Sequence, residues 1–166
     1  MDLDHFNAAP EAELRPELLA CVDVPAWADA LLLRRPYADL DALLRTADEL
    51  ARRFDRADVD RALAQHPRIG ERASGEGTGS RWSRQEQSGV AADARAFLVE
   101  GNRAYEARFG RVFLICATGL SAEQILDNLH SRLGNDDATE AAVVADELRK
   151  IALLRLSKVV DGEAAA

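Results

Sequence analysis

A histidine stands directly before a proline in the stretch QHPRIGE, residues 65–71. Proline disfavours helical geometry in the residue that precedes it, so His66 is expected where a helix ends. A functional interpretation places the His66 imidazole on a rigid corner, where it can move a proton near neutral pH. A structural interpretation makes it a helix stop, with a histidine favourably placed near the helix C-terminus. Taken alone, the motif favours the structural interpretation.

A second polar stretch, WSRQEQSG at residues 82–89, has the spacing of a helix start. Ser83 and Glu86 form an S-x-x-E pattern, in which each side chain can satisfy a backbone N–H group of the first turn. The same helix start would present amides to an anion, and Gln87 adds a side chain that both donates and accepts hydrogen bonds. Local grounds favour the capping interpretation, and the binding interpretation stays open.

Arg155 lies in the apolar stretch KIALLRLSKVV, residues 150–160. Its neighbours Leu154 and Leu156 make the usual surface exposure of an arginine harder to achieve. Its guanidinium either forms a salt bridge at the rim of a helical bundle or grips a carboxylate with two hydrogen bonds. The sequence leaves both interpretations open.

The remaining histidines and the two cysteines show no metal-ligand spacing, and no metal site is expected. His5 is expected in a loose N-terminus, and His130 inside a helix. Cys21 and Cys116 lie in unrelated apolar contexts, and both are expected to be reduced.

Helical periodicity predominates and predicts the elements that position these side chains. Apolar residues recur at helical spacing over residues 11–22, 25–35, 38–54, 57–65, 84–109, 121–133 and 138–159. Pro16 is expected to open or kink the first of these helices, and SAEQ at residues 121–124 has the form of a capping box. The intervening stretches predict a surface loop at 70–81, a strand or buried extended segment at 112–119, and a turn at 134–136. The predicted fold is an all-α, single-domain bundle of seven to eight helices over residues 1–166, with one short irregular buried segment.

Composition narrows the class of protein. The chain has 166 residues, 48% hydrophobic and 30% charged, which is typical of a soluble globular domain. A net charge of −8 argues against nucleic acid and anionic membranes as partners. No apolar run approaches the roughly 18 residues of a membrane span, and the N-terminal stretch has no apolar signal core. A cytoplasmic protein is expected.

The motifs, taken in order, resemble one family. HPRIGE at 66–71, WSRQEQSG at 82–89, FLICATG at 113–119, RLGND at 132–136 and KIALLRL at 150–156 together resemble the decarboxylase of 2-oxo-4-hydroxy-4-carboxy-5-ureidoimidazoline, abbreviated OHCU. The opening stretches FNAAPEAEL and PAWADALLLRRPY also fit the usual start of that family. The resemblance therefore spans nearly the whole chain.

The resemblance implies an all-α enzyme, usually a homodimer, that acts on a small-molecule substrate without a metal or organic cofactor. It places catalytic roles on His66, Glu86 and Arg155, and a pocket-shaping role on Pro67. The implied substrate-binding residues are Pro67, Ser83, Arg84, Gln85, Glu86, Gln87, Phe113, Leu114, Ile115, Cys116 and Ala117. One departure is the pair Arg111–Val112, where the family often has a proline and an aromatic residue.

The implied activity is decarboxylation of OHCU to (S)-allantoin and CO2, the last step from urate to allantoin. Two alternatives stay open: another small-molecule lyase or hydrolase on the same scaffold, and a non-catalytic helical interaction module. The module would not explain why the histidine corner, the S-x-x-E-Q helix start and the late arginine occur together.

Overall fold

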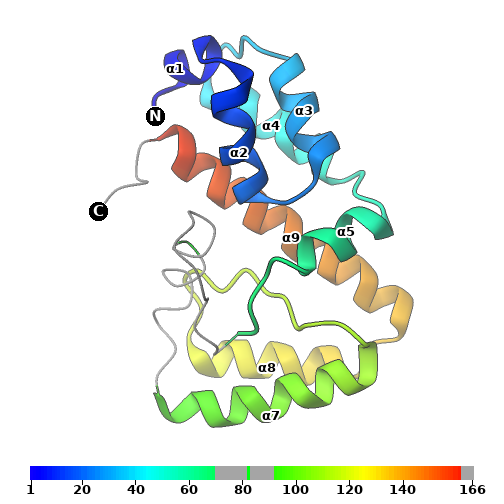
Figure 1. The fold of residues 1–166 in the computed structure, drawn as a ribbon. Coiled ribbons are helices and arrows are strands. Elements are labelled where there is room, and N and C mark those ends of the chain that lie inside the picture. Colours follow the sequence, from blue (N-terminus) through cyan, green and yellow to red (C-terminus); the bar gives the residue numbers. More distant parts are fainter. Residues whose placement is uncertain (70–81, 83–91, 162–166) are drawn as a thin grey trace. The chain divides into compact units, whose positions relative to one another are not determined.

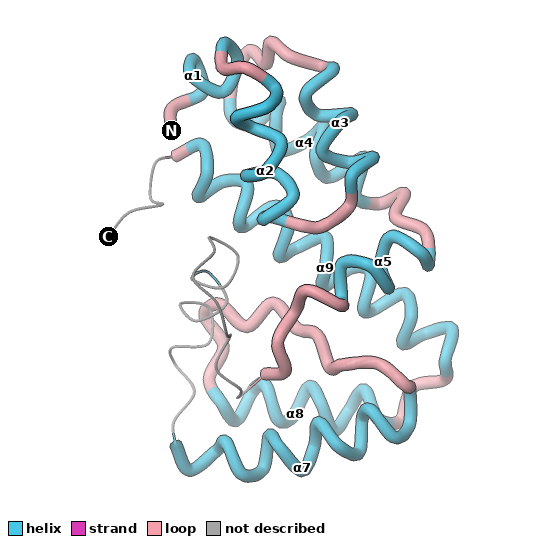
Figure 2. The backbone as a smooth tube through the Cα atoms, in the orientation of Figure 1, coloured by secondary structure: helices cyan, strands magenta, loops and turns pink. Residues whose placement is uncertain are grey.

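The computed structural model describes residues 1–69, Trp82 and residues 92–161 (Figure 1). Within these ranges the chain forms eight α-helices and no strand, joined by irregular segments (Figure 2). The helices are α1 (Leu3–Ala8), α2 (Glu11–Cys21), α3 (Pro25–Leu33), α4 (Leu40–Ala51), α5 (Arg56–Leu63), α7 (Ala92–Phe109), α8 (Ala122–Leu133) and α9 (Asp137–Val160). The all-α prediction is confirmed. No helix in the described part of the chain combines the length and apolarity that crossing a membrane requires.

The chain divides into two compact units. The first comprises residues 1–62 and the chain from Leu148 onward, and the second comprises residues 63–147. Helix α9 begins in the second unit and ends in the first. A single domain over residues 1–166 stays a prediction.

Local signals set most helix ends in the first unit. Pro25 opens α3, where its fixed φ suits the first turn and its missing N–H costs no helical hydrogen bond. Asp39 caps α4, because its side chain accepts a hydrogen bond from the Ala42 N–H at 2.6 Å. Pro16 lies inside α2 rather than at its start. The fully buried side chains of this unit include Phe6, Leu14, Leu18, Leu31 and Leu43.

The N-terminus is helical, so the expectation of a loose segment around His5 is wrong. Asp2 caps α1 by accepting a hydrogen bond from the His5 N–H at 2.8 Å. The Met1 ammonium donates to the Val159 carbonyl at 2.7 Å, and His5 Nε2 lies 2.8 Å from Glu13 Oε1. Contacts to residues distant in sequence therefore order this end of the chain.

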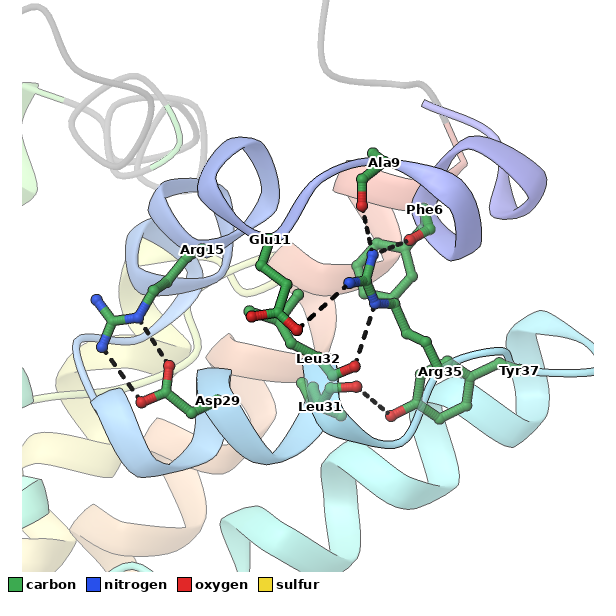
Figure 3. Close-up of polar contacts among 9 residues, drawn as sticks. All are labelled: Phe6, Ala9, Glu11, Arg15, Asp29, Leu31, Leu32, Arg35 and Tyr37. Atoms are coloured by element: carbon green, nitrogen blue, oxygen red, sulfur yellow. Dashed lines mark hydrogen bonds and ion pairs between the residues drawn. The ribbon is translucent and has the colours of Figure 1, made fainter.

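Arg35 holds the backbone of three residues in the first unit (Figure 3). Its Nη1 donates to the carbonyls of Phe6 at 3.1 Å and Ala9 at 2.7 Å, and its Nε donates to the Leu32 carbonyl at 3.2 Å. Nearby, the buried Tyr37 hydroxyl donates to the Leu31 carbonyl at 2.9 Å. Burial raises the pKa of Tyr37 to about 12.

Helices α7 and α8 pack side by side in the second unit (Figure 1). Gly101 permits the close approach, because a Cβ atom built there would lie 3.0 Å from the Leu129 side chain. The predicted capping box opens α8: the Ser121 hydroxyl accepts from the Gln124 N–H at 3.2 Å, and Gln124 Oε1 accepts from the Ser121 N–H at 2.8 Å. That prediction is confirmed.

The segment at 112–117 belongs to neither a helix nor a strand, and most of its side chains are buried. Two glycines in left-handed conformation flank it: Gly110 at φ +68° and Gly119 at φ +80°. Gly110 ends α7, and Gly119 lies in a turn closed by the Leu120 N–H on the Ala117 carbonyl at 3.0 Å. The predicted irregular buried segment is confirmed, and its alternative as a strand is wrong.

The remaining boundaries agree with prediction to within a few residues. Helix α5 ends at Leu63, two residues before the predicted end, and α9 begins at Asp137 rather than Ala138. The predicted start of the long helix at Arg84 and the predicted loop at 70–81 lie outside the described residues.

Candidate active site

His66 lies on a corner directly after α5. Its N–H donates to the Leu63 carbonyl at 3.0 Å, and its side chain is half-buried. Pro67 follows and prevents His66 from continuing the helix. The predicted position of this histidine, at the end of a helix, is confirmed.

Helix α7 holds the two residues that follow this corner. The Arg68 guanidinium pairs with Glu106 through two hydrogen bonds, Nη2 to Oε2 at 3.0 Å and Nε to Oε1. One turn earlier on α7, Asn102 Nδ2 donates to the Ile69 carbonyl at 2.8 Å. The hydrogen bonds from Arg68 lower the pKa of the Glu106 carboxyl from its ordinary value of 4.5, despite the opposing effect of burial. Helix α7 thus contacts two successive residues beside His66, Arg68 through its side chain and Ile69 through its backbone carbonyl.

Two alternate residues of the segment at 113–117 form backbone hydrogen bonds with side chains elsewhere in the chain. The Leu114 carbonyl accepts a hydrogen bond from Arg132 Nη1 at 2.7 Å, and the Cys116 N–H donates to Glu147 Oε2 at 2.7 Å. Within the described part of the chain, neither the N–H nor the carbonyl of Ile115 has a hydrogen-bond partner.

The His66 corner and the 113–117 segment contribute to one apolar cluster. Ile69 from the corner is buried in the same cluster as Phe113, Ile115 and Ala117. The structure therefore brings two of the predicted site segments together. Arg111 and Val112, which depart from the family pattern, precede this cluster and are half-buried.

Arg155 lies in the first unit, on α9. It is 4% exposed, and its Nη1 donates to the Ala20 carbonyl at 3.5 Å. The other predicted binding residues, Ser83, Arg84, Gln85, Glu86 and Gln87, lie outside the described residues. Trp82, which precedes them, is buried.

The sequence did not predict the polar residues that support these segments. Asn102, Arg132 and Glu147 contact the segments directly. Glu140 pairs with Arg132. Two of these residues had a detectable signal, because each is a polar residue on the apolar stripe of its helix. Asn102 lies on the stripe of Leu98 and Tyr105, and Glu140 lies on the stripe of Val144 and Leu148. The Asn102 side chain is 3% exposed, and among the described residues its Oδ1 has no hydrogen-bond partner.

Among the described side chains, no group of three or more histidine, cysteine, aspartate or glutamate residues is arranged to hold a metal ion. Cys21 and Cys116 form no disulfide.

Known proteins match most of the chain. The sequence profile of OHCU decarboxylase matches residues 7–157. The 2-oxo-4-hydroxy-4-carboxy-5-ureidoimidazoline decarboxylase of Amia calva is 32% identical over 142 residues, which cover 82% of this chain and 81% of that protein. The Uric acid degradation bifunctional protein TTL of Arabidopsis thaliana is 29% identical over 154 residues, covering 89% of this chain and 48% of that protein.

A solved structure, the crystal structure of OHCU decarboxylase in the presence of (S)-allantoin, matches with a TM-score of 0.72 and 26% identity. The match covers 88% of this chain and 98% of that one. Fold and relatives together define the class as an all-helical carboxy-lyase. The chain belongs to the OHCU decarboxylase family, whose reaction is a decarboxylation in urate degradation.

Proposed function

We propose that this chain converts OHCU to (S)-allantoin and CO2 without a cofactor, as the last step from urate to allantoin. The observation that carries the proposal is the pairing of a fixed histidine corner with a segment whose Ile115 peptide groups can bind an amide-rich ligand. Membership of the OHCU decarboxylase family supports it. So does the similarity to an enzyme solved in the presence of (S)-allantoin.

The substrate supplies its own electron sink. The carbon that bears the carboxylate neighbours a ring C=N bond, which accepts the electron pair when the C–C bond to the carboxylate breaks and CO2 leaves. The nitrogen of the former C=N bond then gains a proton. The hydroxyl group loses its proton and becomes a carbonyl, while the neighbouring carbon gains one, so the reaction of the substrate carboxylate consumes one proton overall. The protein has to orient the ring, stabilise charge and deliver the proton on carbon to one face.

His66 is assigned the proton transfer. Its imidazole can take the hydroxyl proton, deliver a proton to the new carbanion equivalent, or do both. The hydrogen bond from Asn102 on α7 to the Ile69 carbonyl supports this assignment, because it holds the backbone that follows the histidine corner. Glu86 would orient His66 or a ring N–H, on the strength of the sequence pattern.

Binding of the rest of the substrate is assigned to two groups of residues. Pro67 would shape the pocket beside His66, and the backbone of 113–117 would bind the ring and ureido amides. Arg155 would hold an anionic or carbonyl oxygen with its permanent charge. Sequence resemblance alone supports the further contacts from Ser83, Arg84, Gln85, Glu86 and Gln87.

Assembly and location belong to the same proposal. The family resemblance implies a homodimer that acts on a small molecule, and the sequence features favour a cytoplasmic location. Light scattering coupled to size-exclusion chromatography tests the dimer, since a monomer would elute with the mass of one 18.1 kDa chain.

The catalytic assignment is tested by replacing His66 with alanine and following the loss of freshly generated OHCU. A positioned acid–base group contributes about 10²–10⁴-fold to the rate, so His66→Ala should lose at least that much. His130→Ala is the matched control, because His130 is exposed on α8. A His66→Ala enzyme with the turnover of the wild type would refute the assignment.

A further inference from the structure

The RLGND stretch at 132–136 supports the family resemblance, yet the proposed chemistry assigns it no role. Its arginine is 6% exposed and donates to two elements at once. Arg132 Nη1 donates to the Leu114 carbonyl at 2.7 Å, while Nε and Nη2 donate to Glu140 Oε1 at 2.8 and 2.6 Å. One guanidinium thus joins the predicted substrate-binding segment to α9.

The partner carboxylate is itself fixed. Glu140 is 1% exposed and also accepts hydrogen bonds from the Tyr105 hydroxyl and from Asn135 Nδ2 at 2.9 Å. The Arg132 guanidinium lies 4.6 Å from the centre of the Phe113 ring, which belongs to the segment it holds. A planar group with this many directed contacts has one available orientation, so it can define where the Leu114 carbonyl lies.

Glu147 adds a second contact from α9. It follows Glu140 by seven residues, about two helical turns, and its Oε2 accepts the Cys116 N–H at 2.7 Å. Helix α9 therefore fixes the segment twice, at Leu114 through Arg132 and at Cys116 directly.

These contacts determine which backbone groups a ligand can reach. In an extended chain, peptide groups of alternate residues point to opposite edges. The contacts at Leu114 and Cys116 follow this alternation, which would place the Ile115 N–H and carbonyl on the opposite edge. A donor and an acceptor side by side complement the –NH–CO– unit of a ureido group or a cyclic amide, as one strand pairs with another.

We infer that Arg132, Glu140 and Glu147 are positioning residues, which hold segment 113–117 so that the Ile115 peptide edge binds the amide groups of the substrate. The inference rests on the proposed function and deepens it. The terminal amide of the ureido group lies several bonds from the carbon that loses CO2, so its binding changes little between the ground state and the transition state. Loss of the positioning should then raise KM and leave kcat nearly unchanged.

The first test compares two arginines that hold backbone carbonyls. Arg132→Lys should raise KM for OHCU about tenfold or more, with kcat within about threefold of the wild type, since a lysine cannot reproduce the fork. Arg35→Lys is the control: it disturbs an arginine of the first unit that holds the carbonyls of Phe6, Ala9 and Leu32, and none of its hydrogen bonds is to segment 113–117. If Arg132→Lys, like the control, only lowers the fraction of active enzyme and leaves KM unchanged, the role of Arg132 is purely structural. That result would overturn the inference.

A second pair of variants covers the case in which Arg132→Lys fails to fold. Glu147→Gln keeps an oxygen that can accept the Cys116 N–H and should retain the KM of the wild type. Glu147→Leu removes that oxygen and should raise KM. Equal KM values for the two variants would overturn the inference.

Amide hydrogen exchange separates this inference from the proposed function. Exchange of the Cys116 amide should speed up in Glu147→Leu and stay slow in Glu147→Gln, whether or not OHCU is the substrate. A wild-type protein that does not turn over OHCU would refute the proposed function. Unchanged exchange of Cys116 in Glu147→Leu would refute the positioning.

Discussion

Arg132 and Glu140 form a buried ion pair, with Nε and Nη2 of the arginine 2.8 and 2.6 Å from the same carboxylate oxygen. The pair joins α8 to the start of α9 and supports the Leu114 carbonyl. Burial, followed by the hydrogen bond to Glu140, raises the pKa of the Tyr105 hydroxyl that completes the cluster. Removing one member of such a cluster leaves the others without their partner in a low-dielectric environment.

Glu140→Gln should therefore be strongly destabilising. The substitution leaves the buried Arg132 charge uncompensated, and breaking a buried pair in this way costs about 3–5 kcal/mol. Urea unfolding of the variant measures the loss of free energy of unfolding. Asp29→Asn, which removes an exposed pair with Arg15 at 2.7 Å, is the control and should change stability little. If both substitutions have the same small effect, the pair does not stabilise the second unit.

Gly119 should be the more sensitive of two turn glycines. Its φ of +80° is unfavourable for residues other than glycine. A Cβ atom there would meet nothing within 4 Å, so the cost of Gly119→Ala, about 1 kcal/mol, should come from backbone strain alone. Gly134 has φ −82°, and an added Cβ would make only an ordinary contact with the Ser131 carbonyl at 3.4 Å. Gly134→Ala should be neutral or slightly stabilising. Thermal unfolding of the two variants tests this prediction. Equal losses of stability in Gly119→Ala and Gly134→Ala would contradict it.

The Arg68–Glu106 pair should contribute stability that depends on pH. Hydrogen bonds from Arg68 lower the pKa of Glu106 from its ordinary value of 4.5, so the unfolded chain binds a proton at a higher pH than the folded chain does. The contribution is therefore present above pH 4.5 and is lost as the pH falls through the lower folded value. Glu106→Gln should reduce Tm at pH 7 and approach the wild-type Tm in acid.

Thermal unfolding at several pH values between about 7 and 3 tests this prediction. Glu100→Gln removes an exposed carboxylate from the same helix and serves as the control. A Tm difference between wild type and Glu106→Gln that does not change with pH would show that the pair acts through packing and not through its charge.

The sequence predicted the helices whose ends depend on local chemistry. Pro25 starts α3, the Ser121 and Gln124 pair starts α8, and Pro67 keeps His66 outside the helix, all through neighbours a few residues away. Helix α1 was missed because one of its supports is the Met1 ammonium on Val159, 158 residues distant. Periodicity within a six-residue helix carries too little signal to replace such a contact.

For the candidate site, too, the sequence predicted local motifs but not the contacts between distant residues. The composition and order of its motifs indicated the histidine corner and the buried segment at 113–117. The contacts that fix that segment join residues 18 and 31 positions apart, Leu114 with Arg132 and Cys116 with Glu147. The sequence gives no direct sign of such pairings, because the spacing between helices and not the pattern within one helix creates them.

The chirality of the product tests the central proposal most directly. OHCU is generated in place from urate and followed by circular dichroism with and without the protein. Unassisted decay should yield racemic allantoin and no lasting signal. The proposed function predicts faster loss of OHCU together with a persistent signal of (S)-allantoin. Loss of OHCU at the rate of the blank, with no lasting signal, would contradict it.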